Sequence, residues 1–198
     1  CFQAGANNTS SGSYCTTFGH ANTNSSTYGL ISAYNSSTSG DGGPFVLGGK
    51  ANTNSNVTSG GIIGGEQNTN TGNRSVIIGG QSCTASSIYT IVYGNSGTAD
   101  RLGQHTIGFG SFAAVGDAQK VSFGLRVKTT NATPTTLLLL GTAGNLLTIP
   151  SGKIFSATIK VTGIKSDGSA SAEYWRRARI KNVGGTTTLV GAVETIGT

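Results

Sequence analysis

Residues 45–54, FVLGGKANTN, recur in altered form as GIIGGEQNTN at 61–70, VIIGGQSCTA at 76–85 and IVYGNSGTA at 91–99. The first glycine of each segment gives a register mark, and these marks follow one another at steps of 16, 15 and 15 residues. A fixed short period with strand-forming triplets and no helical pattern is typical of a solenoid whose turns stack through backbone hydrogen bonds.

Weaker copies extend the repeat in both directions: FQAGANNT at 2–9, TTFGHANTN at 16–24, LISAYNSS at 30–37 and TIGFGSF at 106–112. Their marks are Ala4, Gly19, Ala33 and Gly110. The sequence therefore predicts a parallel β-roll or β-helix of about eight turns of 15–16 residues over 1–117. We expect almost no helix, because the chain has 32 glycines and only 10% charged residues.

Apolar triplets precede the register marks. Because side chains alternate between the two faces of a strand, an unbroken triplet buries both faces. One face can fill the interior of the coil, and we expect the other to pack against identical chains around an axis, as a homotrimer. The residues predicted to form this core and trimer packing are Phe45, Val46, Leu47, Ile62, Ile63, Val76, Ile77, Ile78, Ile91, Val92 and Tyr93.

Glycines follow the triplets at sites where we expect sharp corners, with positive φ or close backbone approach. These turn glycines are Gly48, Gly49, Gly64, Gly65, Gly79, Gly80 and Gly94. Phosphate binding is not indicated, because the full dinucleotide and P-loop spacings and the helix that follows them are missing. The Asn-Thr-Asn runs at 22–24, 52–54 and 68–70 share one phase, which predicts turn residues bonded to neighbouring turns.

The SVIIGG motif at 75–80 and its copies resemble the repeats of the YadA-type head β-roll of trimeric adhesins and its relatives in phage tail proteins. The resemblance covers about residues 2–117. It implies a left-handed parallel β-roll and the association of three chains into one stalk or head. The turns here are longer than is usual in that family, so the sequence leaves the handedness open.

A second region, 118–198, holds ten of the thirteen Lys and Arg but only three of the seven acids. Strands are predicted at 121–130, 136–140, 154–164, 174–182 and 186–194, with short polar turns between them. This spacing favours an antiparallel β-sandwich, jelly-roll-like in character.

Four segments of this region resemble a module common in phage and virus-like tail proteins: TTNATPTTLLLL at 129–140, LTIPSGKIFSATIKVTGIKSDG at 147–168, AEYW at 172–175 leading into Arg179, and GGTTTLVGAVET at 184–195. Members of that module continue for further strands, so we expect it to be incomplete at its C-terminus. The resemblance implies a tail fibre, spike or capsid-decoration component at the virion surface, in contact with other virion proteins.

A cluster of aromatic and basic residues is the one segment that suggests a ligand, because aromatics and arginines suit sugars and polyanions. Strand alternation would place Tyr174 and Arg176 on one face, and Trp175, Arg177 and Arg179 on the other. We therefore favour a solvated or inter-subunit face. Contact with a surface glycan is the alternative, and nucleic acid is less favoured.

No catalytic residue, metal site or cofactor is predicted. His20 and His105 lie about 85 positions apart, and Cys1, Cys15 and Cys83 form no metal-binding spacing. We expect the cysteines to be reduced and buried, with disulfides between chains as the alternative. Membrane insertion is not expected, because no apolar run reaches about 18 residues.

Three functions fit these observations. The favoured one is a non-enzymatic, extracellular virion protein whose trimeric shaft projects a β domain for host attachment. A receptor-binding adhesin that recognises surface glycan is the second. A polysaccharide depolymerase is the third, and it would need two carboxylates roughly 5 to 9.5 Å apart. The acids available in the first region are Asp41, Glu66, Asp100 and Asp117.

Overall fold

The computed structural model describes residues 1–55, 58–130 and 133–197 of the chain. Every regular element in these ranges is a β-strand, which confirms the predicted all-β class. Contacts divide the chain into two compact units, Cys1–Asn145 and Leu146–Thr198, and each is described by itself.

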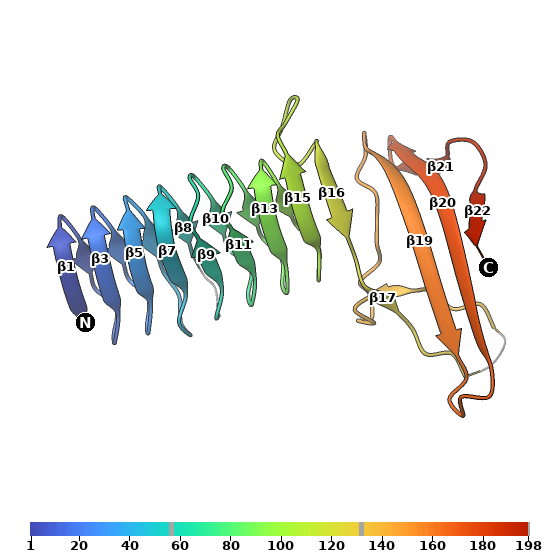
Figure 1. Ribbon diagram of the computed structural model, residues 1–198, viewed down its shortest axis with the longest axis horizontal. Coiled ribbons are helices and arrows are strands. Elements are labelled where there is room, and N and C mark those ends of the chain that lie inside the picture. Colours follow the sequence, from blue (N-terminus) through green and yellow to red (C-terminus); the bar gives the residue numbers. More distant parts are fainter. Residues whose placement is uncertain (56–57, 131–132, 198) are drawn as a thin grey trace. The chain divides into compact units, whose positions relative to one another are not determined.

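The first unit is a parallel β-solenoid in which each of the first seven turns contributes one long and one short strand, and the eighth contributes a long strand (Figure 1). The long strands form a sheet in the order β1 (Phe2–Ala6), β3 (Thr16–His20), β5 (Leu30–Tyr34), β7 (Phe45–Lys50), β9 (Gly61–Ile63), β11 (Val76–Ile78), β13 (Ile91–Asn95) and β15 (His105–Phe109). The short strands form a second sheet of β2 (Thr9–Ser10), β4 (Thr23–Asn24), β6 (Ser37–Thr38), β8 (Thr53–Asn54), β10 (Thr69–Asn70), β12 (Thr84–Ala85) and β14 (Thr98–Ala99).

The turns differ in length. On the short-strand side, one backbone N–H group of each turn donates to a side chain of the preceding turn. The donors are Asn22, Ser36, Asn52, Asn68 and Cys83, and their acceptors lie 14, 14, 16, 16 and 15 positions earlier in the chain. The predicted 15–16 residues therefore hold for the middle turns, while turns at both ends of the solenoid have 14. Part of the extra length comes from the glycine pairs, since the register of β5 on β7 shifts where Ala33 faces Gly48 and Gly49.

Two of the register marks at the ends of the repeat were wrong by one or two residues. Gly19 pairs with Gly5 rather than with Ala4, and Gly94 pairs with Gly108 rather than with Gly110. The terminal copies lack the apolar triplet, so the sequence offered no second feature to fix their register.

Aliphatic side chains fill the solenoid interior. One residue from each middle turn points inward, and all of them are fully buried: Ile31, Val46, Ile62, Ile77 and Val92. Full burial of such a side chain stabilises the fold by about 1.5–3 kcal/mol. The same row ends in polar residues, because Thr17 and Thr106 are also 0% exposed.

Two corners of each turn use the left-handed backbone region. At the first corner, φ lies between 48° and 57° at Asn7, Ala21, Asn35, Ala51, Gln67, Ser82 and Ser96. At the second, φ lies between 53° and 63° at Tyr14, Tyr28, Ser59, Arg74 and Tyr89. Since non-glycine residues seldom adopt this region, it is the stacking of turns that holds them there.

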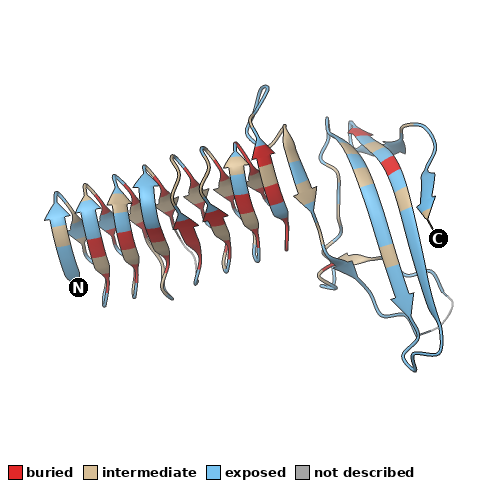
Figure 2. Cartoon of the chain, in the orientation of Figure 1, coloured by how far each residue is buried: buried red, intermediate tan, exposed pale blue. Residues whose placement is uncertain are grey.

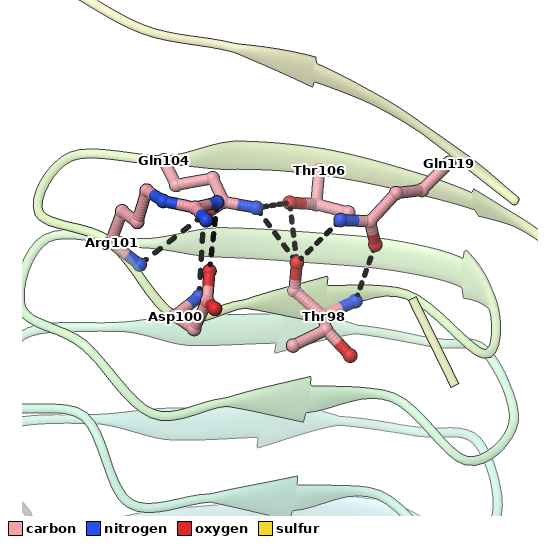
Figure 3. Close-up of polar contacts among 6 residues, drawn as sticks. All are labelled: Thr98, Asp100, Arg101, Gln104, Thr106 and Gln119. Carbon is pink, nitrogen blue, oxygen red and sulfur yellow. Dashed lines mark hydrogen bonds and ion pairs between the residues drawn. The ribbon is translucent and has the colours of Figure 1, made fainter. Parts of the chain in front are cut away.

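The C-terminal end of the solenoid is closed by side chains (Figure 3). The amide of Gln119 accepts from the Thr98 N–H at 2.7 Å and donates to the Thr98 carbonyl at 3.1 Å, so it replaces a further short strand beside β14. Gln104 is fully buried, and its Nε2 donates to Thr98 O at 2.7 Å and to Thr106 Oγ1 at 2.9 Å.

The chain stays with the solenoid beyond the end of the repeats. β16 (Gln119–Ser122) pairs antiparallel with β15, and β17 (Leu125–Arg126) pairs with β18 (Leu138–Leu139). The sequence placed the division at 117/118, where the composition changes. Contacts place it at 145/146, because these short strands belong to the first unit.

The second unit is an antiparallel sheet of β19 (Ile154–Ile164), β20 (Ser171–Val183), β21 (Thr186–Leu189) and β22 (Glu194–Gly197). The predicted antiparallel arrangement is confirmed, and β19 has the bounds expected from the sequence. Ala178 and Asn182 are the buried residues of the described part of this unit, and Figure 2 shows its strands largely exposed. The described residues of the unit thus form one layer, and the facing layer of a sandwich does not come from them.

Candidate functional site

The outward side of the long-strand sheet is apolar and exposed. Its side chains lie one residue after the buried core row, so strand alternation points them away from the interior. The exposed fractions are 40% for Phe18, 39% for Leu47, 44% for Ile63, 48% for Ile78 and 42% for Tyr93. We call this surface the outer face.

The predicted packing residues therefore separate into two sets. Val46, Ile62, Ile77 and Val92 fill the interior, whereas Leu47, Ile63, Ile78 and Tyr93 lie on the outer face. The remaining three residues, Phe45, Val76 and Ile91, are half-buried. The sequence thus identified an apolar second face correctly, and its cover by identical chains stays a prediction.

Outer-face side chains form continuous rows across the turns. Leu47 pairs with Ile63, and Ile63 pairs with Ile78, so like residues stack at a strand spacing of about 4.8 Å. At the N-terminal end, the rings of Phe2 and Phe18 lie 5.5 Å apart. The rows make a strip of apolar surface that is regular along the solenoid.

The paired glycines differ in what they require. A Cβ atom at Gly49 would overlap the carbonyl oxygen of Gly65 in the next turn, and Gly65, Gly80 and Gly94 face a carbonyl in the same way. The first member of each pair, Gly48, Gly64 or Gly79, has open space around it. All seven predicted turn glycines have positive φ, so the first members are constrained only by backbone conformation.

Asparagines inside the coil form a ladder that sequence reasoning placed in the turns. Asn22, Asn52 and Asn68 are at most 1% exposed. Asn52 Oδ1 accepts from the Asn68 N–H at 3.0 Å, and Asn68 Oδ1 accepts from the Cys83 N–H at 2.9 Å. The predicted hydrogen bonds between turns are present, but the burial of the asparagines was missed. A signal for it was available, because two Asn residues separated by one Thr point to the same side of a strand.

Cys83 occupies the next step of that ladder. Its Sγ lies 3.3 Å from the Gly94 carbonyl oxygen, and burial raises the pKa of the thiol. Cys15 is also buried while Cys1 is exposed, and all three cysteines are free. The expectation of reduced, buried cysteines therefore holds within this chain for two of the three.

The second unit presents two different faces. In the register of β19 on β20, Lys160 lies opposite Trp175, Thr158 opposite Arg177 and Ser156 opposite Arg179. Tyr174 and Arg176 lie on the other face, as alternation predicted, among Phe155, Ile159, Val161 and Ile180. Sequence reasoning missed Lys160, which lies on this face from the neighbouring strand β19. Lys181 lies on the same face, two residues after Arg179 on β20.

The acids of the first unit all have structural partners. Asp41 accepts from Thr27 Oγ1 at 2.8 Å, Glu66 lies 3.9 Å from Lys50 Nζ, and Asp100 lies 3.2 Å from Arg101 Nη1. Asp117 accepts from the backbone N–H groups of residues 112–114. None of these contacts pairs two carboxylates.

The histidines lie far from each other in the fold. His20 stacks on Tyr34 with ring centroids 5.3 Å apart, and His105 lies at the other end of the solenoid. There it lines a shallow groove of about 240 Å³ with Tyr93, Ile107, Lys120 and Ser122. In the described ranges, no three His, Cys, Asp or Glu side chains come together to hold a metal ion.

Comparisons with family models, with curated proteins and with solved structures each gave no match to this chain. None of the described residues forms a helix long and apolar enough to cross a membrane. The candidate functional surfaces are thus the apolar outer face of the solenoid and the basic face of the second sheet.

Proposed function

We propose that this chain is a non-enzymatic structural protein of the virion surface, whose solenoid forms a homotrimeric shaft that carries the second unit for host attachment. The observation that carries the proposal is the outer face: its rows of Phe, Leu, Ile and Tyr remain 39% to 48% exposed in the single chain. Contiguous apolar surface of this kind marks a site of association.

The regular spacing of the outer face favours a second copy as the partner. A surface that packs against these rows needs side chains that repeat at the spacing between neighbouring strands, about 4.8 Å. An identical chain has this same spacing. Rotation about a shared axis closes the assembly, and three copies would bring the outer faces together around it.

Charge also favours identical copies. The two outward rows from β1 to β13 contain no charged residue: Phe2, Thr16, Leu30, Phe45, Gly61, Val76 and Ile91 in one, and Ala4, Phe18, Ser32, Leu47, Ile63, Ile78 and Tyr93 in the other. Equivalent residues can therefore meet across a symmetry axis without repulsion between like charges. Each Å² of apolar surface covered contributes roughly 25 cal/mol.

The virion location is supported by the two resemblances in the sequence, of the repeats to trimeric adhesin heads and of the second region to a phage tail module. The structural role is supported by the acids of the solenoid, which contact hydroxyl, cationic or backbone partners rather than each other.

A pair of matched variants tests the proposal. Ile63→Glu with Ile78→Glu puts two charges on the outer face, while Asn35→Asp with Gln67→Glu puts two charges on exposed residues of the first corner, away from it. Light scattering should give a trimer for the wild type and the corner variant, and a monomer with an unchanged β-type circular dichroism spectrum for the outer-face variant. Equal masses for all three proteins would refute the interface.

A further inference from the structure

One face of the second sheet carries a row of cations beside a tryptophan. Trp175, Arg177, Arg179 and Lys181 alternate along β20, and Lys160 lies opposite Trp175 on β19. Alternate residues of a strand are about 6.8 Å apart, so the four β20 side chains extend over roughly 20 Å. We call these five residues the cationic row.

The cationic row is only half neutralised. Lys160 Nζ lies 3.1 Å from Glu173, and Arg177 Nη1 lies 3.3 Å from Glu194. Arg179 and Lys181 form no ion pair among the described residues, although both are exposed. Two adjacent cations of the row are thus available to an anionic ligand.

Hydroxyl groups flank the row. Ser156, Thr158 and Thr162 of β19 lie on the same face, opposite Arg179, Arg177 and Glu173. Trp175 is 41% exposed, with Lys160 Nζ 5.9 Å from the ring centre. The face therefore combines positive charge, hydroxyl hydrogen-bonding groups and one aromatic ring.

We propose that the cationic row binds a linear acidic polysaccharide, with its carboxylate or sulfate groups on Arg179 and Lys181 and a sugar ring against Trp175. Guanidinium and ammonium groups bind such anions by charge-assisted hydrogen bonds, and the β20 members of the row repeat at every second residue of one strand. The β19 hydroxyls are placed to bond the sugar hydroxyls. This binding function goes beyond the shaft and does not depend on the number of chains.

Single-stranded nucleic acid fits the face less well. Sequence-tolerant binding of a strand relies on successive aromatic side chains, on which successive bases stack. Trp175 is the one aromatic residue of the cationic row, and Tyr174 lies on the opposite face of the sheet. The hydroxyl-rich β19 side offers partners suited to sugars instead.

The test measures binding of the intact chain to a heparin fragment, to polygalacturonate, to neutral dextran and to oligo-dT, over a series of salt concentrations. The variant is Arg179→Gln with Lys181→Gln. Its matched control is Lys153→Gln with Lys165→Gln, which removes two exposed charges of the same unit from the turns before and after β19.

We expect the row variant to bind the acidic polysaccharides at least tenfold more weakly, with the slope of log affinity against log salt reduced by about two. The control should change affinity less than threefold, and dextran should not bind. Trp175→Ala should weaken binding several-fold without changing the salt slope.

Equal losses in the row variant and its control would overturn the proposal, since they would show attraction by overall charge alone. Tighter binding of oligo-dT than of either polysaccharide would overturn it in favour of nucleic acid. The absence of polysaccharide binding by the wild type, with the circular dichroism spectrum of a folded β protein, would also overturn it.

Discussion

Individual residues at the corners of the solenoid decide whether successive turns can stack. The sequence shows glycine pairs but not which member matters, because that depends on what the next turn places against each α-carbon. In the structure, the second glycine of a pair lies against a backbone carbonyl, whereas the first has positive φ and open space.

Gly49→Ala is therefore expected to destabilise the protein much more than Gly48→Ala. A left-handed alanine costs about 1–2 kcal/mol, which is the whole penalty at position 48. At position 49 the new Cβ also overlaps the Gly65 carbonyl oxygen, so the two turns must separate. Urea unfolding of both variants checks this, and equal losses of stability would show that steric contact between turns is unimportant.

Cys83 gives a second prediction at this scale. Burial raises the pKa of its thiol, so the unfolded chain loses the proton at lower pH than the folded chain does. This contribution to stability is full below the ordinary thiol pKa and is lost as the pH rises above about 8.5 towards the folded value. Cys83→Ser should flatten the decline in thermal stability between about pH 8.5 and 10.

A thiol reagent provides the matching check. Cys1 is exposed while Cys15 and Cys83 are buried, so the native protein should react rapidly at one thiol and the denatured protein at three. Rapid reaction of Cys83 in the native protein would contradict its place in the ladder.

At the scale of elements, the strands were largely predictable and the interior was only partly so. Apolar triplets located the long strands of the middle turns, and the sequence also located β19 at its observed bounds. The buried asparagines were placed in turns, because polar side chains enter a core only where a neighbouring turn supplies hydrogen-bond partners. Those partners are visible only in three dimensions.

The asparagine ladder should carry a measurable share of the stability. Asn68→Ala leaves the Cys83 N–H without its acceptor at 2.9 Å, while the Gly80 carbonyl loses one donor at 3.2 Å and keeps the Glu66 N–H at 2.9 Å. An unpaired buried group costs about 1–3 kcal/mol, so we expect a loss of about 1–3 kcal/mol in denaturant unfolding. Thr69→Ala, at the adjacent half-buried position, should cost less than about 1 kcal/mol, and a similar loss in both variants would argue against the ladder.

At the scale of the molecule, each unit taken by itself leaves apolar side chains exposed. In the first unit, these side chains are those of the outer face. In the second unit, they lie on the face of the sheet that carries Phe155, Ile159 and Val161. The sequence indicated an uncovered face of the solenoid but not the single layer of the second unit. Its regular strand spacing is equally compatible with one sheet or two.

Covering the outer face by identical chains is the central claim, and the mass of the intact protein in solution tests it most directly. Light scattering should give about three times 19.9 kDa, unchanged in high salt because the interface is apolar. A mass of 19.9 kDa at micromolar concentration would contradict the claim, because no second copy would then cover the rows of Phe, Leu, Ile and Tyr on the outer face.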